Sequence, residues 1–234
     1  LDRPEKYHSF IREMALQLQE TLEKCRENDN VRAIMITATG KAFCAGQDLT
    51  EAIDPSIPSI STIIQEHYNP IIRKIRNIEK PIVAAVNGVA AGAGASIALA
   101  CDIIVATESA SFVQAFSKIG LIPDSGATFF LPRLVGMQKA TALMMSGEPI
   151  LAKDAETMGM IYKTYSDEKF ELESWNLVSK LSKMPTKGLG LTKKLLNASI
   201  NNDLEDQLIM EDKCQVTAAN TAESNAQVDA TRRQ

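Results

Sequence analysis

Residues 81–101 read PIVAAVNGVAAGAGASIALAC, and this uncharged stretch decides the fold. A run of about 21 apolar and small residues is long enough to span a bilayer. Its interior argues against a membrane helix, because residues 81–86 have the continuous apolar pattern of a buried strand. Asn87 and Gly88 are typical of a turn, and residues 92–100 begin a helix from a glycine-rich loop. We therefore predict a buried strand, a loop and a buried helix.

The flanking sequence alternates between helical and strand patterns. Apolar residues recur at helical spacing in five segments, which are residues 10–22, 60–78, 137–146, 175–181 and 191–196. Short apolar runs predict strands at residues 33–37, 103–106 and 161–165. We expect Pro70 to kink or break the second helical segment, and Gly147 to end the third. This alternation indicates an α/β fold.

The composition excludes several classes of protein. Of 234 residues, 45% are hydrophobic and 23% are charged, and the net charge is −4, so we expect a globular protein without a nucleic-acid partner. No CxxC, HxH or HxxxH spacing occurs, which argues against a histidine-ligated zinc site or a Ser-His-Asp triad. We expect four reduced thiols and a cytoplasmic location. The chain opens with Leu1 and not Met, so we expect it to begin inside a longer protein.

Two glycine-bearing loops follow apolar strands, at residues 41–49 (KAFCAGQDL) and 87–94 (NGVAAGAG). Small residues let a ligand or another backbone approach closely, and the second loop leads into a helix whose first N–H groups face outward. Together the loops can offer two backbone donors to one oxygen, an oxyanion hole worth about 3 kcal/mol per donor. The alternative is that the glycines only permit tight packing of strand on helix.

The second loop also fits a dinucleotide-binding turn. Glu108 lies about 20 residues beyond Gly88, and Tyr165 with Lys169 has the spacing of a reductase pair. Against this interpretation, the loop comes some 80 residues into the chain, a loop-like Ser-Asp-Glu follows Tyr165, and no serine lies shortly before it. A dinucleotide-dependent reductase remains an alternative of a different class.

Residues 116–126 (FSKIGLIPDSG) set Asp124 among apolar side chains. If its carboxylate faces an apolar cavity, burial raises its pKa above about 3.9 and suits it to shuttle a proton. The alternative is a plain helix N-cap. We interpret Asp48 and Asp102 as structural residues that cap or tie loops, and Arg133 and Lys139 as part of a solvated face.

The combination of motifs resembles the crotonase, or enoyl-CoA hydratase/isomerase, superfamily. The resemblance covers about residues 1–215 and is carried by LDRPEK (1–6), FCAGQDL (43–49), NGVAAGAG (87–94), CDI (101–103), SGE (146–148) and LTKKLL (191–196). The runs QAFSKIGLIPDSG (114–126) and LPRL (131–134) are similar to an isomerase branch of the family that serves phenylacetate breakdown.

The resemblance implies an α/β spiral of ββα turns over residues 1–185 and a C-terminal helical trimerisation region over residues 186–234. It implies a CoA thioester as substrate, with coenzyme A only as part of that substrate, and neither a separate cofactor nor a metal. It also implies a homotrimer or a dimer of trimers, without a membrane partner. Residues 217–234 are small and polar, so we expect either a frayed end or an arm that orders against another subunit.

The resemblance further implies which residues act. The main-chain N–H groups of Gln47 and Ala93 would be the oxyanion-hole donors, with Ala93 in place of the family's usual middle glycine. Coenzyme A and its acyl group would lie against Ala45, Gln47, Gly92, Ala93 and Phe116. Asp124 stands where several isomerases of the family carry their acid/base carboxylate.

Departures from the family pattern narrow the choice among the reactions that the family catalyses. Family hydratases use two glutamates, and the matching positions here hold Ser96 and Phe116. One carboxylate, Asp124, suffices to move a proton between two carbons, whereas hydration normally needs two. The resemblance therefore implies an acyl-CoA isomerase, with a Δ3,Δ2-enoyl-CoA isomerase of fatty acid metabolism as the runner-up, a hydratase less favoured, and a non-catalytic acyl-CoA-binding protein as the alternative class. The segment after Asn220 lacks the basic, aromatic lid helix common in the family.

Overall fold

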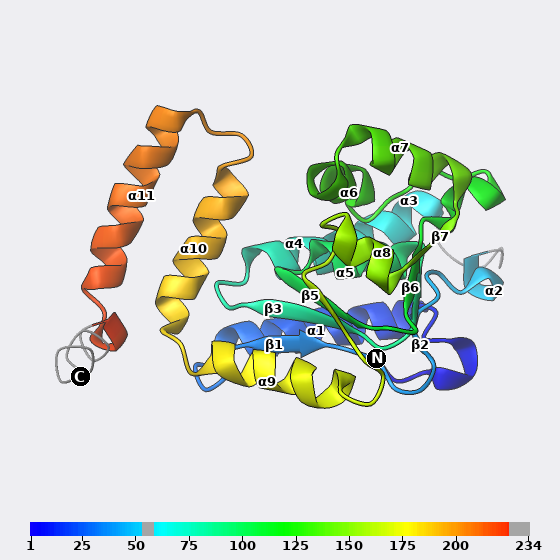
Figure 1. Cartoon of the computed structure of the whole chain (residues 1–234), viewed down its shortest axis with the longest axis horizontal. Helices are drawn as coiled ribbons and strands as arrows, with labels where there is room; N and C mark the ends of the chain where they lie inside the picture. Colours follow the sequence, from blue (N-terminus) through cyan, green and yellow to red (C-terminus); the bar gives the residue numbers. More distant parts are fainter. Residues whose placement is uncertain (53–58, 225–234) are drawn as a thin grey trace.

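A computed structural model describes residues 1–52 and 59–224 of the chain. Two four-stranded sheets lie at its centre (Figure 1). The first is parallel, with the strand order β1 (Ile34–Ile36), β3 (Ile82–Val86), β5 (Ile103–Thr107) and β8 (Lys163–Tyr165). The second has the order β2 (Ala42–Cys44), β4 (Val89–Ala91), β6 (Ser111–Val113) and β7 (Pro149–Leu151), and only β7 is antiparallel. From β1 to β6 successive strands alternate between the two sheets, and this arrangement confirms the predicted α/β fold.

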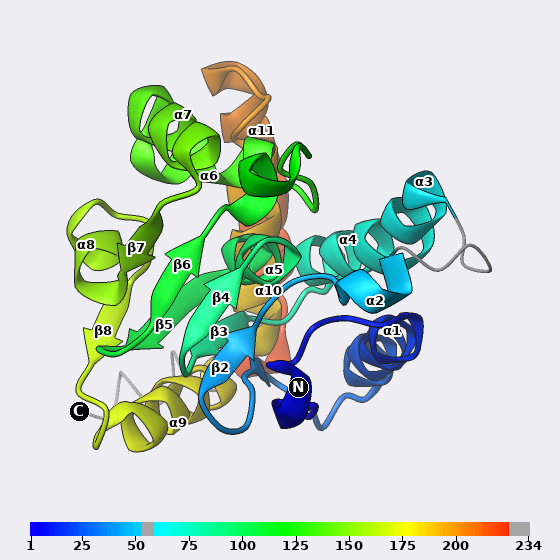
Figure 2. The ribbon, with the colours of Figure 1, turned by 90° about the vertical axis from the view of Figure 1, so that its right-hand side faces the viewer.

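Helices surround the two sheets (Figure 2). The α-helices are α1 (Arg12–Glu27), α2 (Leu49–Ala52), α3 (Ile60–Thr62), α4 (Asn69–Asn77), α5 (Ala93–Ala100), α6 (Ala127–Val135), α7 (Met137–Ser146), α8 (Ala152–Thr157), α9 (Phe170–Ser182), α10 (Thr186–Ala198) and α11 (Leu204–Ala219). Short segments of other helix types are η1 (Pro4–Lys6), η2 (Ile63–Tyr68) and η3 (Ala115–Ile119). The last two α-helices form a hairpin that stands away from the sheets (Figure 1).

Strand β3 is apolar throughout because both of its faces are covered. Val83 and Ala85 pack with side chains of α9, while Ile82, Ala84 and Val86 pack in the main core on the opposite face. All eight residues of α5 are buried as well. The prediction of a buried strand followed by a buried helix is confirmed, and within the described ranges no helix is both long and apolar enough to cross a membrane.

The two loops expected at residues 41–49 and 87–94 each contain a short strand, which corrects the prediction. Strands β2 and β4 lie inside these segments and pair in parallel. The sequence gives little sign of them, because three residues are too few to display the alternation by which strands are recognised. The four cysteines are free, as predicted.

The helical segment at residues 60–78 runs on through Pro70 without a break, and it changes its helix type before the proline. Helix α3 leads into the π-helical turn η2, and α4 then begins with Pro70 in its first turn. Proline has no N–H to donate and its ring crowds the preceding turn, so a widened turn before it is the expected response of the backbone. The π-helical turn carries the buried side chains of His67 and Tyr68.

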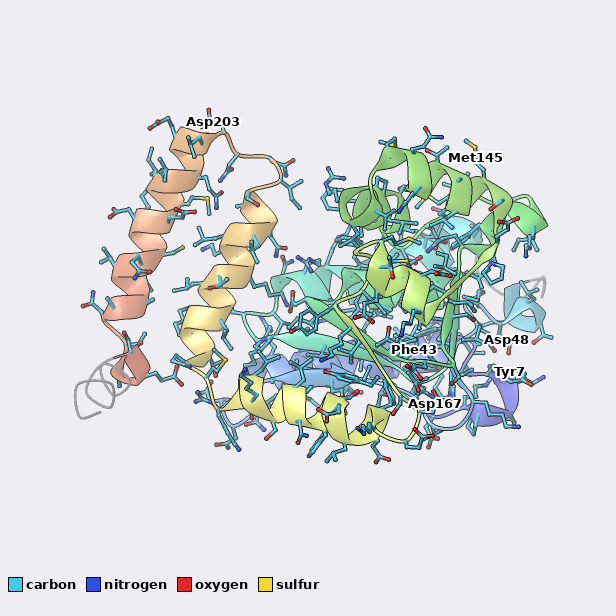
Figure 3. The ribbon with its side chains drawn as sticks, in the orientation of Figure 1. Tyr7, Phe43, Asp48, Met145, Asp167 and Asp203 are labelled. Atoms are coloured by element: carbon cyan, nitrogen blue, oxygen red, sulfur yellow. The ribbon has the colours of Figure 1, made fainter. Side chains whose placement is uncertain are left out.

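Apolar periodicity did not predict helix α11, which lies within the C-terminal helical region that the family resemblance implied. Asp203 caps its start, accepting a hydrogen bond from the N–H of Asp206 at 2.9 Å (Figure 3). Its apolar residues Leu204, Leu208 and Val216 are exposed. They do not form the apolar stripe that is typical of a helix packed against the core of its own chain. The expected polar tail therefore begins inside a helix, and residues 225–234 lie outside the described part. The division of the chain after residue 185 stays a prediction.

Candidate active site

The two glycine-bearing segments meet at the start of α5. Strands β2 and β4 are parallel neighbours, so the residues that follow them lie at one edge of their sheet. A Cβ atom added to Gly46 would lie 3.0 Å from the carbonyl oxygen of Ala91 and 3.5 Å from the amide nitrogen of Ala93. Gly46 has φ +92° and Gly92 has φ +53°, conformations that favour glycine. Both glycines are therefore needed for this close approach of two backbones.

Two main-chain donors are free at this junction. Phe10 bridges the first segment, with its N–H donating to Gly46 O at 2.7 Å and its carbonyl accepting from the N–H of Asp48 at 2.9 Å, so the N–H of Gln47 between them is unused. Ala93 is the first residue of α5, where an N–H has no intrahelical acceptor. Across residues 1–52 and 59–224, neither of these two N–H groups donates to a protein acceptor. Such a pair of donors suits an oxyanion.

Asp48, which is labelled in Figure 3, stabilises the segment that carries Gln47. Its Oδ1 accepts from the N–H of Thr50 at 3.0 Å and from the Thr50 hydroxyl at 2.6 Å, and its Oδ2 accepts from Arg3 Nη1 at 2.8 Å. The Thr50 hydrogen bond and then the Arg3 guanidinium hold the pKa of Asp48 at about 2, below its ordinary 3.8, and burial opposes this only in part. The structural role predicted for Asp48 is confirmed.

Asp124 is half-buried in the turn between η3 and α6. Burial raises its pKa, which is the predicted direction, while a 2.9 Å hydrogen bond from the Ser125 hydroxyl to Asp124 Oδ1 opposes the rise. The N-cap of α6 is Gly126, and no side chain caps that helix. The N-cap interpretation of Asp124 is therefore wrong, and its carboxylate is left for chemistry.

Tyr68 contacts the donor loop, and sequence reasoning missed it. Its phenol O–H donates to Gln47 Oε1 at 2.6 Å. Burial raises the pKa of Tyr68, so the phenol keeps its proton. In the sequence nothing separates Tyr68 from an ordinary core residue of a helix.

The two positions at which family hydratases carry glutamates hold groups unsuited to activating water. Ser96 is fully buried, and its hydroxyl donates to the carbonyl of Gly92 at 3.1 Å within the first turn of α5. Phe116 is buried too, and its Cζ lies 3.9 Å from the point where a Cβ on Gly92 would be. The wall of the candidate site beside the two free N–H groups is therefore apolar.

Ala45 differs from Gln47 and Ala93 because its N–H is used. It donates to Tyr7 O at 2.9 Å, while the Ala45 side chain is exposed next to the donor loop. Ala45 thus has surface to offer to a ligand, and its main-chain N–H is not a third oxyanion donor.

Three other charged residues considered in the sequence lie outside the candidate site. Asp102 accepts from Ile82 N at 2.8 Å and pairs with Lys193 at 2.8 Å, so it ties β3 to α10, as predicted for a structural residue. The Arg133 guanidinium carbon lies 3.8 Å from the ring centroid of Phe129 on an exposed face, and Lys139 is exposed as well. The solvated face predicted for both is confirmed.

The dinucleotide interpretation fails on the placement of its paired residues. Tyr165 lies in strand β8 and Lys169 precedes helix α9, so the two do not share one helical face. The ring of Tyr165 has Lys163 over it, 5.5 Å from the centroid. The glycine-rich segment of the loop follows β4, a strand of the second sheet, and not the first strand of the chain.

Known proteins match along the whole chain. The model of the enoyl-CoA hydratase/isomerase family matches residues 1–233. The 1,2-epoxyphenylacetyl-CoA isomerase of Escherichia coli is 42% identical over 233 residues, covering 98% of this chain and 89% of its own, and a "Probable enoyl-CoA hydratase" of Rhodobacter capsulatus is 38% identical over 230 residues, covering 98% and 88%. The crystal structure of an enoyl-CoA hydratase/isomerase from Cupriavidus metallidurans superposes with a TM-score of 0.92 at 31% identity, covering 100% of this chain and 88% of its own. The chain belongs to the enoyl-CoA hydratase/isomerase, or crotonase, family of enzymes that act on CoA thioesters.

Proposed function

We propose that this enzyme is an acyl-CoA isomerase with Asp124 as its acid/base. The observation that carries the proposal is the pair of main-chain N–H groups at Gln47 and Ala93, brought together by the pairing of β2 with β4, in a chain whose half-buried Asp124 carboxylate has a pKa raised by burial. The N–H groups of Gln47 and Ala93 hold the thioester oxygen, as both are free of protein acceptors within the described residues.

The reaction runs through an enolate. The Asp124 carboxylate takes a proton from a carbon activated by the thioester, and the electron pair of that C–H bond moves onto the thioester oxygen. The two N–H donors stabilise the negative charge there by about 3 kcal/mol each. Asp124 then returns its proton to a different carbon of the same acyl group, the electrons on oxygen re-form the thioester carbonyl, and the carbon–carbon double bond stands at its new position. No atom is gained or lost, so the product is an isomer of the substrate.

A raised pKa suits Asp124 for both halves of this cycle. Burial makes the carboxylate a stronger base than an exposed aspartate, so proton abstraction costs less free energy. The Ser125 hydroxyl stabilises the ionised carboxylate and so opposes the rise in pKa that burial causes. The balance resembles that of other enzymes in which a carboxyl group must both accept and donate a proton.

Isomerisation is favoured over hydration by what stands at the two glutamate positions. The Ser96 hydroxyl is engaged with the Gly92 carbonyl, and Phe116 offers only a ring. Water that enters the site would have Asp124 alone to act as both base and acid. A proton shuttle between two carbons of one acyl group needs no more than that.

We propose an aryl-epoxide CoA thioester as the substrate. The proposal is supported by the 42% identity to the Escherichia coli 1,2-epoxyphenylacetyl-CoA isomerase and by the apolar ring of Phe116 beside the donor loops. For this substrate the C–C bond shared by the epoxide and the six-membered ring breaks and the ring double bonds shift, so that the ring expands to an oxepin. Asp124 takes a proton from the carbon next to the thioester and returns it to a ring carbon, while the thioester oxygen is held as above. Coenzyme A would then pass the exposed side chain of Ala45.

We also propose that the α10–α11 hairpin makes subunit contacts in a homotrimer or a dimer of trimers. Leu204, Leu208 and Val216 expose between 47% and 70% of their surface on a helix that stands away from the sheets (Figure 1). Apolar side chains gathered on such a projecting element favour burial against a second chain. Light scattering on the purified protein gives the mass of the assembly directly, and a monomer would contradict this proposal.

The substrate class is tested by presenting three CoA thioesters to the wild-type enzyme and following the products by mass spectrometry and chromatography. We expect 1,2-epoxyphenylacetyl-CoA to be converted to a product of equal mass, faster than 3-hexenoyl-CoA is. We expect little or no addition of water to 2-hexenoyl-CoA. Faster isomerisation of 3-hexenoyl-CoA would move the assignment to a Δ3,Δ2-enoyl-CoA isomerase, and dominant water addition would move it to a hydratase. Binding of all three without product would identify a non-catalytic acyl-CoA-binding protein.

A further inference from the structure

We propose that Tyr68 is a positioning residue that holds the oxyanion-hole donor of Gln47 in place through the Gln47 side chain. The inference rests on the proposed function, which gives the N–H of Gln47 its role. Tyr68 ends the π-helical turn η2, only 2% of its surface is exposed, and its phenol O–H donates to Gln47 Oε1 at 2.6 Å. This contact joins two segments that lie 21 residues apart in the chain.

Both polar ends of the Gln47 side chain are engaged. Its Oε1 accepts from Tyr68, and its Nε2 donates to Glu51 Oε2 at 3.0 Å. Glu51 in turn accepts from the N–H of Arg12 at 2.9 and 3.1 Å, at the start of α1. The side chain of Gln47 is thus held between Tyr68 at the end of η2 and Glu51 in α2.

The main chain of Gln47 is fixed by the same neighbourhood. Phe10 bonds to the residues on either side of Gln47, through Gly46 O at 2.7 Å and Asp48 N at 2.9 Å. The ring of Phe10 packs edge-on against the ring of Tyr68, with centroids 5.7 Å apart. Tyr68 therefore supports Gln47 twice, once through its hydroxyl and once through its aromatic contact with Phe10, which bonds on either side of Gln47. Donors held in place before the substrate binds are those that contribute most to catalysis.

The hydroxyl of Tyr68 remains a donor across the working pH range. Burial raises its pKa above the ordinary value of 10, and the charges of Asp124 and Glu51 act in the same direction. When Asp124 ionises to act as a base, the phenol is therefore held more firmly in its protonated form. The hydrogen bond to Gln47 persists through the step in which the oxyanion forms.

The test is Tyr68→Phe, which keeps the ring against Phe10 and removes only the O–H. We expect kcat to fall about tenfold, a loss of the size of one hydrogen bond, with KM changed by about twofold or less. A second readout is the C=O stretching band of phenylacetyl-CoA labelled with ¹³C at the thioester carbon. We expect binding to wild-type enzyme to lower the frequency of this band, and the Tyr68→Phe enzyme to lower it less.

Two further variants make the result specific. Tyr162→Phe removes the hydroxyl of an exposed tyrosine and should leave kcat and the band at their wild-type values. Gln47→Met removes the side-chain amide but keeps the main-chain N–H, so its effect and that of Tyr68→Phe should not multiply in the double variant. If Tyr68→Phe fails to fold, a Gln47→Met enzyme with a wild-type band overturns the inference by itself, and a band shifted back toward that of the free thioester supports it.

The outcomes separate this inference from the proposed function. A band in Tyr68→Phe identical to that of wild type, or losses that multiply in the double variant, overturn the positioning role while isomerase activity stands. A wild-type enzyme that lowers the band but isomerises none of the thioesters overturns the proposed function and leaves the role of Tyr68 intact.

Discussion

The hydroxyl of Ser125 donates a 2.9 Å hydrogen bond to the carboxylate of Asp124, and this bond opposes the effect of burial on the same group. Burial is the larger influence, so the pKa of Asp124 stands above its ordinary 3.8. Ser125 also has φ +53°, a conformation that costs a residue with a side chain on the order of 1 kcal/mol. The strained backbone of Ser125 therefore places the hydroxyl that influences the ionisation of Asp124.

The pH profile should respond to Ser125. Its hydroxyl stabilises the ionised carboxylate, so Ser125→Ala and Ser125→Gly should both raise the pKa of Asp124 further. Because Asp124 must be ionised to act as a base, the acidic limb of kcat/KM should move to higher pH in both variants. Ser125→Gly should also be the more stable of the two, since glycine tolerates the positive φ. An acidic limb that stays at the wild-type pH in both variants would show that Asp124 does not set it.

The N–H of Ala93 can be removed with little change to its helix. Proline is well tolerated in the first turn of a helix, where its missing N–H has no intrahelical acceptor. We expect Ala93→Pro to lower kcat by about 10²- to 10³-fold, as the loss of one oxyanion donor does. Ala93→Gly keeps the N–H and serves as the matched control, with kcat within about threefold of wild type. Equal kcat values in the two variants would contradict the donor role of Ala93.

Asp48 should contribute to stability in a pH-dependent way. Its pKa is about 2 in the folded protein and 3.8 ordinarily, so its contribution is complete above pH 3.8 and is lost as the pH falls toward 2. At pH 7, Asp48→Asn should lower the free energy of unfolding by about 2 kcal/mol. Urea denaturation at pH 7 and at pH 3 measures the difference, which should be smaller at pH 3. Asp29→Asn, at an exposed position, is the control, and a difference independent of pH would count against the role of Arg3 and Thr50 as partners.

Gly94 should tolerate no side chain, unlike Gly188. A Cβ on Gly94 would lie 2.6 Å from Cys44 Cβ and 2.7 Å from Cys44 Sγ, where β2 crosses α5. Gly94→Ala should therefore lower the free energy of unfolding by about 1–3 kcal/mol. At Gly188 in α10 the nearest atom is 4.0 Å away, and Gly188→Ala should raise that free energy by up to about 1 kcal/mol, because alanine is the better helix former. Chemical denaturation of the two variants gives the comparison, and equal losses would contradict the contact at Gly94.

Strand β3 and helix α5 could be predicted because both are buried, and buried segments consist of apolar and small residues. Residues 81–86 read as a buried strand since α9 covers one face of β3 and the main core covers the other. Pro70 predicted a disturbance of the helix because proline has no N–H to donate, and the π-helical turn η2 precedes it. Helix α11 left no comparable record, because several of its apolar residues are exposed.

The site was only partly predictable for a related reason. Glycines at 46 and 92 indicate two loops able to approach a ligand, but only the pairing of β2 with β4 brings them together. The donor roles of Gln47 and Ala93 came from resemblance to the family, whereas Asp124 was also indicated by its apolar neighbours in the sequence. Tyr68 could not be predicted, since its hydrogen bond to Gln47 depends on how a π-helical turn packs against a segment 21 residues earlier.

The most direct test of the account is Asp124→Asn, with the rate of isomerisation of 1,2-epoxyphenylacetyl-CoA and the affinity for phenylacetyl-CoA measured on the same preparation. Asparagine keeps the size of the side chain but cannot accept and return a proton. We predict an affinity within about threefold of wild type and a kcat lower by about 10²- to 10⁴-fold. An Asp124→Asn enzyme that binds the thioester and turns it over at the wild-type rate would contradict the claim that Asp124 is the acid/base.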